Sequence, residues 1–269
     1  MFICYTSLMN PWAFKRKSIT FGIFLLFVLL FVALPAYYFT RSSPKCTNLI
    51  QDGDETGVDC GGSCALLCKP ETLPLITRGE ARINRISSSS YTASVLVENP
   101  NLSGEVKRAK YNLSIYSSGV KDPVKVFNKE TYIGPNSTFA LFEGPFTLTG
   151  SGPFRAVFEW EDGLIWEKNV VSSALIGVES PNLLITATSS QRLEARLINR
   201  STKSISNVEV VAILSDIDGN TVASSKTFVD FIEAGDSAPI SFSWPEPFAS
   251  VPVTTKILPH PLPDKSYIR

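Results

Sequence analysis

The sequence has very little of the chemistry that enzymes use, with one histidine in 269 residues. That residue, His260, stands between two prolines, where we expect an extended tail exposed to solvent. No second histidine is present to support Ser-His-Asp or Cys-His catalysis. The chain also lacks G-x-x-x-x-G-K-[ST] and G-x-G-x-x-G, the loops that cradle phosphates. These absences predict a protein that is not an enzyme, and they identify no cofactor and no small-molecule substrate.

An excess of charge is also missing. Lysine and arginine together number 25, as do aspartate and glutamate, so the formal net charge is zero. A chain without a basic field is not expected to bind nucleic acid. After residue 40 no long segment shows a helical period, and Ser, Thr, Val, Ile, Pro and Asn are frequent. We therefore predict a mostly β fold for this part of the chain.

What is present first is one long apolar run. No charged residue occurs between Lys17 and Arg41. A helix rises about 1.5 Å per residue, so this run reaches roughly 35 Å, enough to cross a hydrocarbon core of ~30 Å. We predict a transmembrane helix over residues 19–40.

The basic residues at the two ends of the run predict its orientation. Lys15, Arg16 and Lys17 precede the run, whereas only Arg41 and Lys45 follow it closely. This favours residues 1–18 in the cytoplasm and the bulk of the chain outside it. A cleaved signal peptide would have a shorter apolar region and small residues before the cleavage site. We therefore predict a retained signal anchor in a single-pass membrane protein.

Four cysteines follow the run, within residues 41–71. They are spaced C-x13-C-x3-C-x3-C and are Cys46, Cys60, Cys64 and Cys68. Outside the cytoplasm so short a segment needs cross-links, which predicts two disulfides with three pairings open. Zinc is the alternative, although zinc ribbons usually carry two C-x2-C knuckles. A thiol-redox role is weaker because no C-x-x-C pair occurs, and Cys4 is expected to stay a free thiol.

The same segment is acidic. Asp52, Asp54 and Asp59 alternate with glycine and a hydroxyl residue in a pattern that can wrap calcium with oxygen ligands. Ser63 stands where an EF-hand loop requires a bidentate glutamate. The alternative is a polar turn, in which these side chains cap backbone groups between the disulfides.

The stretch DGDETGVDCGG carries a resemblance. It resembles a small cysteine-rich segment, roughly C-x-(N/D)G-x2-(N/D)GDET-x-VDCGG-x-C-x2-3-C, that occurs in many bacterial and other surface proteins. The resemblance covers about 23 residues. It implies an extracytoplasmic module and no reaction.

Downstream, the chain repeats itself at a spacing of about 100 residues. Residues 93–99 align with 193–199, each an alternating apolar segment that ends on an asparagine, and later segments align in the same order. Short strands separated by turn residues predict two tandem antiparallel β-sandwiches, over 72–175 and 176–258, followed by a Pro-rich tail over 259–269. The predicted core residues are Val95, Val97, Leu113, Ile115 and Val157 in the first sandwich and Leu193, Leu197, Val208, Val210 and Trp244 in the second.

Two Asp-Gly pairs predict hairpins. Asp162-Gly163 is expected to reverse the chain between strands near 155–160 and 164–166. The segment 216–220 is expected to do the same between strands at 208–214 and 221–228. The acidic residues at the first tip are expected to face water.

The order of these segments is similar to bacterial immunoglobulin-like repeats of the FxLYD, LEA14-like and CARDB type, over about 180 residues. Such domains are mostly binding or spacer modules. We therefore expect a non-catalytic, membrane-anchored extracytoplasmic protein with a protein or cell-wall partner. The alternatives are an accessory subunit of an envelope, secretion or cell-wall assembly, and a metal- or redox-responsive protein that uses the cysteine module.

Overall fold

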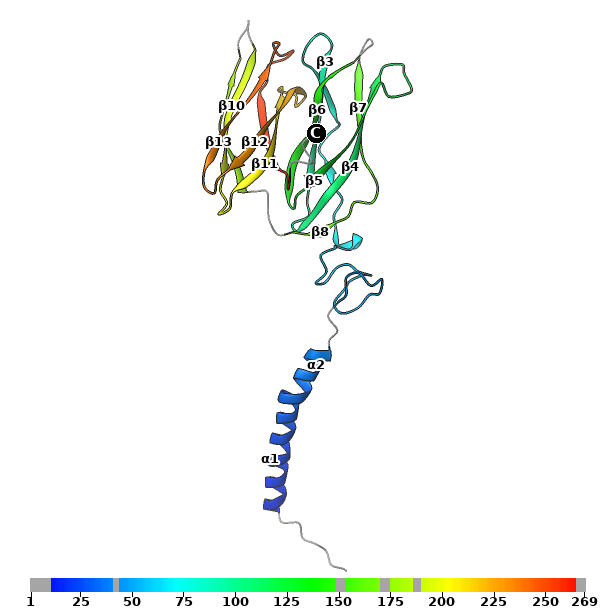
Figure 1. Ribbon diagram of the computed structural model, residues 1–269, viewed down its shortest axis with the longest axis vertical. Coiled ribbons are helices and arrows are strands. Elements are labelled where there is room, and N and C mark those ends of the chain that lie inside the picture. Colours follow the sequence, from blue (N-terminus) through cyan, green and yellow to red (C-terminus); the bar gives the residue numbers. More distant parts are fainter. Residues whose placement is uncertain (1–10, 41–43, 149–152, 170–174, 186–189, 265–269) are drawn as a thin grey trace, which may run out of the picture. The chain divides into compact units, whose positions relative to one another are not determined.

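The computed structural model describes residues 11–40, 44–148, 153–169, 175–185 and 190–264. The chain divides into two compact units, Met1–Cys64 and Ala65–Arg269. The first holds the N-terminal helix and most of the cysteine segment, and the second holds all of the strands (Figure 1). The fold is mostly β with antiparallel sheets and one N-terminal apolar helix, as the sequence predicts.

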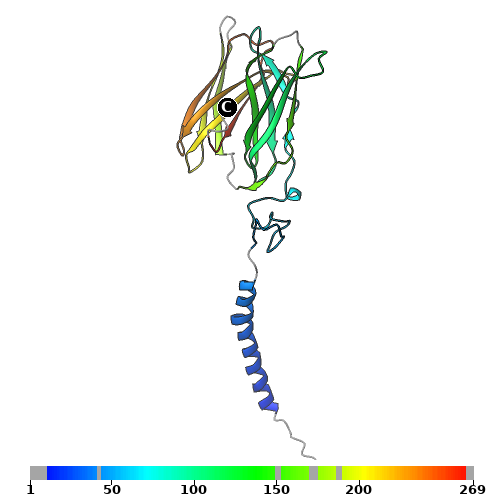
Figure 2. The same ribbon diagram turned by 45° about the vertical axis from the view of Figure 1, so that its right-hand side comes forward.

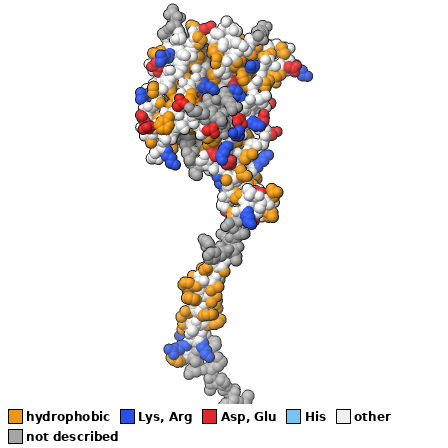
Figure 3. Space-filling view, viewed as in Figure 1, with side chains coloured by type: hydrophobic (Ala, Val, Ile, Leu, Met, Phe, Trp, Pro, Cys, Tyr) orange, Lys and Arg blue, Asp and Glu red, His pale blue; other side chains and the backbone are white. Residues whose placement is uncertain are grey.

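The helix consists of α1 (Pro11–Val28), a π-helical turn (Leu29–Ala33) and α2 (Leu34–Thr40). Of the described helices it alone is long and apolar enough to cross a membrane, over Lys15–Tyr37. Its apolar side chains are exposed along its length, and Figure 3 shows basic side chains gathered at its N-terminal end. Near its start the Thr20 hydroxyl donates a hydrogen bond to the carbonyl of Arg16 (2.9 Å).

Eight strands between residues 76 and 168 form the first sandwich. In one sheet β3 (Ser90–Asn99) pairs with β6 (Ser137–Thr147) on one side and with the short β1 (Ile76–Thr77) and β2 (Arg82–Arg85) on the other. In the second sheet β4 (Gly104–Ser117) lies between β5 (Lys125–Ile133) and β7 (Phe154–Trp160), and β8 (Glu167–Lys168) also pairs with β4.

The core of the first sandwich follows the alternation of its strands, with one correction. Val95 and Val97 from β3 and Leu113 and Ile115 from β4 are buried, as predicted. Val157 was predicted to join them, which is wrong. In β7 the side chains that pack on the core are those of Phe154, Ala156 and Phe158, so Val157 lies on the outer face. Short apolar runs such as Ala-Val-Phe do not by themselves fix which face is buried.

The second sandwich has six strands, and its predicted core residues are all buried. In one sheet β10 (Gln191–Asn199) lies between β9 (Ile176–Leu184) and β13 (Ser237–Trp244). In the other β11 (Ile205–Ser215) lies between β12 (Thr221–Ile232) and β14 (Thr254–Pro261). Since β9–β14 follow the same order and pairing as the strands from β1/β2 to β7, the two sandwiches have one topology and the internal repeat is structural.

A buried asparagine links the loops of the first sandwich. Asn99 ends β3, and its side-chain amide donates to the carbonyls of Gly104 (2.8 Å) and Gly134 (2.7 Å). Its Oδ1 accepts from the backbone N–H of Asn101 (3.0 Å). One side chain therefore satisfies backbone groups from two separate loops.

The second sandwich repeats this arrangement at the aligned position. The Asn199 side chain donates to the carbonyls of Lys203 (2.8 Å) and Glu233 (3.0 Å) and accepts from the N–H of Ser201 (3.0 Å). Glu233 aligns with Gly134, so both loops are joined in the same way. The asparagine that ends each repeated segment is thus a structural residue of the fold.

One predicted hairpin is present and the other is not. Residues 216–220 reverse the chain between β11 and β12, with Oδ1 of Asp216 accepting from the N–H groups of Asp218 (3.1 Å) and Asn220 (2.8 Å). Asp162-Gly163 does not turn the chain. Trp160 lies opposite Tyr111 and Glu167 opposite Glu105, so β7 and β8 run along β4 in one direction with a bulge between them.

The two sandwiches pack face to face, which gives four sheet layers (Figures 1 and 2). The outer face of the β2-β3-β6 sheet meets the outer face of the β12-β11-β14 sheet. At the centre lies a shared apolar cluster of Ala140, Phe142, Val211, Ile213 and Leu258. Each sandwich keeps its own core, and this further cluster joins the two.

Polar contacts flank this cluster. The Asn84 side chain on β2 donates to the carbonyl of Thr221 (3.0 Å), and the hydroxyls of Thr92 and Ser224 lie 3.3 Å apart. Asn84, Thr92 and Ser224 are all buried. Because buried polar groups are costly unless they are paired, these bonds favour one docking geometry over others.

Candidate functional site

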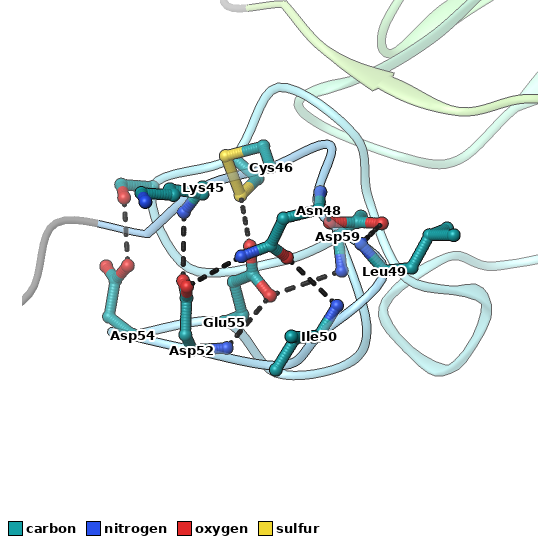
Figure 4. The surroundings of a disulfide bond; sticks show 11 residues. Lys45, Cys46, Asn48, Leu49, Ile50, Asp52, Asp54, Glu55 and Asp59 are labelled. Atoms are coloured by element: carbon teal, nitrogen blue, oxygen red, sulfur yellow. Dashed lines mark hydrogen bonds between the residues drawn. A yellow bond between two sulfur atoms is a disulfide. The ribbon is translucent and has the colours of Figure 1, made fainter.

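The cysteine segment is held by two disulfides, as predicted. Cys46 and Cys64 are joined (Figure 4), and Cys60 and Cys68 are also disulfide-bonded. Cys4 lies outside the described residues. All four sulfurs are oxidised, so they do not supply the thiolates that a zinc site requires.

The acidic side chains of the segment turn inward to its own backbone (Figure 4). The carboxylate of Asp59 accepts from the N–H groups of Asn48 (2.8 Å) and Leu49 (2.9 Å). That of Asp52 accepts from the N–H of Lys45 and the side chain of Asn48, both at 2.9 Å. The Asp54 carboxylate accepts from the Ser63 hydroxyl (2.8 Å). A calcium ion would have to compete with these donors for the same oxygens.

Glu55, which the sequence reading did not single out, is the central residue of the segment. Its side chain is buried, and Oε2 accepts from the N–H groups of Asp52 and Asp59, both at 3.2 Å. Oε1 lies 3.2 Å from the Cys64 sulfur. Glu55 with Cys46 and Cys64 is the one cluster of potential metal ligands found in the described residues, and two of its members are disulfide sulfurs.

Backbone geometry explains the glycines of DGDETGVDCGG. Gly53, Gly61 and Gly62 all have positive φ, as does Asp59. A Cβ at Gly62 would lie 2.0 Å from the carbonyl oxygen of Asp54, so no other residue fits there. The carboxylates and glycines of the motif therefore build the loop itself.

The interface of the sandwiches holds a second group of charged side chains. The Tyr111 hydroxyl donates to Glu143 (2.8 Å), which also pairs with Lys129 (3.3 Å). Glu209 and Lys226 form a neighbouring ion pair at 3.0 Å. These side chains line a cavity of about 30 Å³, which holds about one water molecule. Burial and the charge of Glu143 raise the pKa of Tyr111, so its phenol stays protonated and remains a donor.

A second cavity, of about 230 Å³, also opens at this interface. Phe142 and Pro145 from the first sandwich and Trp244 and Pro245 from the second contribute to its walls. The Trp244 indole N–H already donates to the carbonyl of Ser224 (3.2 Å). Among its lining residues Lys226 carries the only full charge, and Glu209 neutralises it.

His260 lies in this interface, which corrects the expectation of a solvent-exposed tail. It belongs to β14, is buried, and stacks on Phe139 with ring centroids 4.3 Å apart. Its Nε2 lies 2.9 Å from the carbonyl oxygen of Tyr132; since a carbonyl only accepts, Nε2 carries the proton. Burial lowers the pKa of His260 to about 4, against the smaller opposing effect of that hydrogen bond. The sequence did not predict this strand because Pro259 and Pro261 flank the histidine.

The acidic group predicted at a hairpin tip, Glu159, Glu161 and Asp162, lies instead at the end of β7 and in the bulge after it. All three side chains are exposed. None of the three lines either of the two cavities described above.

No protein-family model and no curated protein matches the chain. Among solved structures, a β-glucuronidase from glycoside hydrolase family 2 is 13% identical, with 82% of this chain and 29% of that chain covered and a TM-score of 0.22. A β-glucuronidase of Bacteroides uniformis is 14% identical, with 61% and 22% covered and a TM-score of 0.18. The chain thus spans less than a third of their length. Likenesses at these TM-scores carry no argument about fold or activity.

Proposed function

We propose that the chain is a non-catalytic, membrane-anchored protein whose two sandwiches form one body outside the cytoplasm and bind a partner or hold it away from the membrane. The observation that carries this proposal is the face-to-face packing of the sandwiches, through the cluster around Phe142 and Val211. A body fixed in this way suits a spacer or a binding platform better than two modules joined by a free linker.

The chemistry of the buried groups supports the non-catalytic part. His260 is stacked and hydrogen-bonded inside the interface, and the carboxylates of the cysteine segment cap its own backbone. The basic residues before the helix support the orientation, because positive residues are retained on the cytoplasmic side. The small disulfide-linked segment supports an oxidising compartment.

Impermeant thiol labelling tests the location. Ile217, at the tip of the second hairpin, is 79% exposed, so Ile217→Cys offers a reactive thiol in the sandwiches. The unchanged chain is the matched control, since Cys4 is its one cysteine outside the disulfide set. We expect Ile217→Cys to label in intact cells and the unchanged chain to label only after lysis. Labelling in the reverse order would overturn the proposed orientation.

Recovery of partners tests the binding role. The full chain is purified from solubilised membranes beside a chain that ends at residue 75, which keeps the helix and the cysteine segment. We expect proteins or cell-wall fragments that copurify with the full chain and are lost from the short one. Identical sets would contradict a role for the sandwiches in binding.

A further inference from the structure

The strand β7 forms a free edge of the first sandwich, since within the described residues it pairs only with β4. At the two ends of the β4–β7 pairing, the N–H of Ser118 donates to the carbonyl of Pro153 and the N–H of Glu161 donates to the carbonyl of Lys110. Bonding alternates along an antiparallel pair, so residues 155, 157 and 159 point their backbone groups toward β4. Residues 154, 156, 158 and 160 therefore present N–H and C=O groups to the open side.

The equivalent edge of the second sandwich is blocked. By the alignment of the repeats, Lys256 on β14 takes the place of Val157, and Pro259 takes that of Trp160. Leu262 N–H bonds to the carbonyl of Asn207, which places the nitrogens of residues 259 and 261 on the open side. Proline cannot donate there, and a lysine at the centre of an edge repels a second copy of itself.

The edge strands β1 and β2 are only two and four residues long, which limits pairing along them. The other long edge strands each carry a lysine or a proline. Their blocking residues are Lys125 and Lys129 on β5, Pro145 on β6, Pro181 on β9, Lys226 on β12 and Pro239 on β13. β7 reads Phe-Arg-Ala-Val-Phe-Glu-Trp, without proline or lysine. An open edge of this kind is a template for another strand.

The sequence of β7 is complementary to itself. When two copies run antiparallel about Val157, Arg155 of each lies opposite Glu159 of the other, and the two Val157 side chains meet between these ion pairs. Arg155 and Glu159 are exposed on one face of the sheet, and in the described chain neither has an ion-pair partner. Opposite charges directly across an antiparallel pair stabilise it, whereas like charges destabilise it.

The other face of β7 also fits this pairing. Phe154, Phe158 and Trp160 point toward the sandwich core but are only partly buried. In the same register Phe154 lies opposite Trp160 of the second copy, and Ala156 lies opposite Phe158. An added strand would cover the aromatic side chains that the edge leaves open.

We propose that β7 is a homodimerisation strand: two copies of the chain pair antiparallel through β7 about a two-fold axis at Val157, which joins two three-stranded sheets into one. The occupant of the edge is a second copy because the charges of β7 are complementary to those of the same strand reversed. Such a contact is isologous and therefore closes after two copies.

Disulfide trapping in the full-length, membrane-inserted chain tests the proposal. Val157→Cys places two thiols face to face at the axis, in a non-hydrogen-bonded pair where side chains approach most closely. Lys256→Cys is the matched control on the equivalent strand of the second sandwich. On mild oxidation we expect Val157→Cys, and not Lys256→Cys, to give a cross-linked species of twice the chain mass. Equal cross-linking of the two, or cross-linking of Val157→Cys to a different protein, would overturn the proposal.

Charge reversal separates this pairing from chance collision. Added to Val157→Cys, either Arg155→Glu or Glu159→Arg puts like charges across both outer pairs and should lower dimer yield by roughly tenfold. The double reversal, or a mixture of the two single reversals carrying different tags, restores opposite charges and should restore the dimer. Both residues are exposed, so an unchanged melting temperature shows that folding is intact. A dimer yield that does not change with the single reversals, or that the double reversal does not restore, would contradict pairing about Val157.

Discussion

The two sandwiches share a strand order and a buried asparagine at the same position, yet their last strands have diverged. β14 carries Lys256, Pro259 and His260, and its histidine reaches into the first sandwich. β7 carries none of these and leaves its outer edge open. The comparison teaches that the repeat preserves what holds each sandwich together, while the copies differ in what each one contacts.

The largest expected effect comes from a charge in the second core. Leu197 is fully buried, so Leu197→Asp loses a packed side chain and buries a carboxylate, at a cost of more than about 4 kcal/mol. If the sandwiches were independent, only the second would unfold. Because they share the cluster around Phe142, we expect hydrogen exchange to rise in the β3 and β6 peptides of the first as well. Ile217→Asp, at an exposed position, is the control and should change neither.

The asparagine pair tests whether the two copies use one design. Asn99→Ala and Asn199→Ala each leave several buried backbone groups unpaired, and we expect each to cost about 3 kcal/mol. The two losses should be similar in chemical denaturation of the full chain. A loss at only one of these sites would show that the copies are joined differently.

His260 distinguishes the second copy from the first by its pH dependence. Burial lowers the pKa of His260 to about 4, from an ordinary value of 6.5, so the unfolded chain binds the proton more readily. Stability from this residue is complete above about pH 6.5 and is lost as the pH falls toward 4, by about 2 kcal/mol at pH 5. Denaturation at about pH 8 and pH 5 measures this loss. His260→Gln should remove the part of the pH dependence that His260 causes, and an unchanged profile would contradict the burial.

The smallest effect concerns the loops that join the second and third long strands of each copy. Asp216 accepts two backbone N–H groups in the turn of the second sandwich, so Asp216→Ala should cost about 1 kcal/mol. Asp122 lies in the corresponding, longer loop of the first sandwich and is exposed. Asp122→Ala should therefore leave the melting temperature unchanged. Equal losses would remove this difference between the copies.

Much of the fold could be predicted because it follows from local patterns in the sequence. Alternation placed Val95, Leu113 and Leu197 in their cores, and the shared spacing of the two segments predicted the repeat. The prediction that Val157 is buried was wrong because the apolar run Ala-Val-Phe does not fix which face of the strand is buried. The hairpin predicted at Asp162-Gly163 was wrong because a glycine with positive φ occurs in a bulge as well as in a turn.

The interface and the role of Glu55 could not be predicted, for a different reason. Phe142, Val211 and His260 lie far apart in the sequence, and only the docked sheets bring their side chains together. Their outward-facing apolar pattern on strands that are buried on both faces was the available signal. Glu55 caps backbone groups that become neighbours only after the disulfides close.

The packing of the two sandwiches into one body is tested most directly by a distance measurement between them. Val120 in the first sandwich and Ile217 in the second are both exposed. Spin labels are attached to cysteines at these two positions in a full-length chain that also carries Cys4→Ser. Pulsed electron paramagnetic resonance should give one narrow distribution of the distance between the two labels. It should broaden when Val211→Asp places a charge in the shared cluster. A broad distribution in the unchanged interface, insensitive to Val211→Asp, would contradict the account.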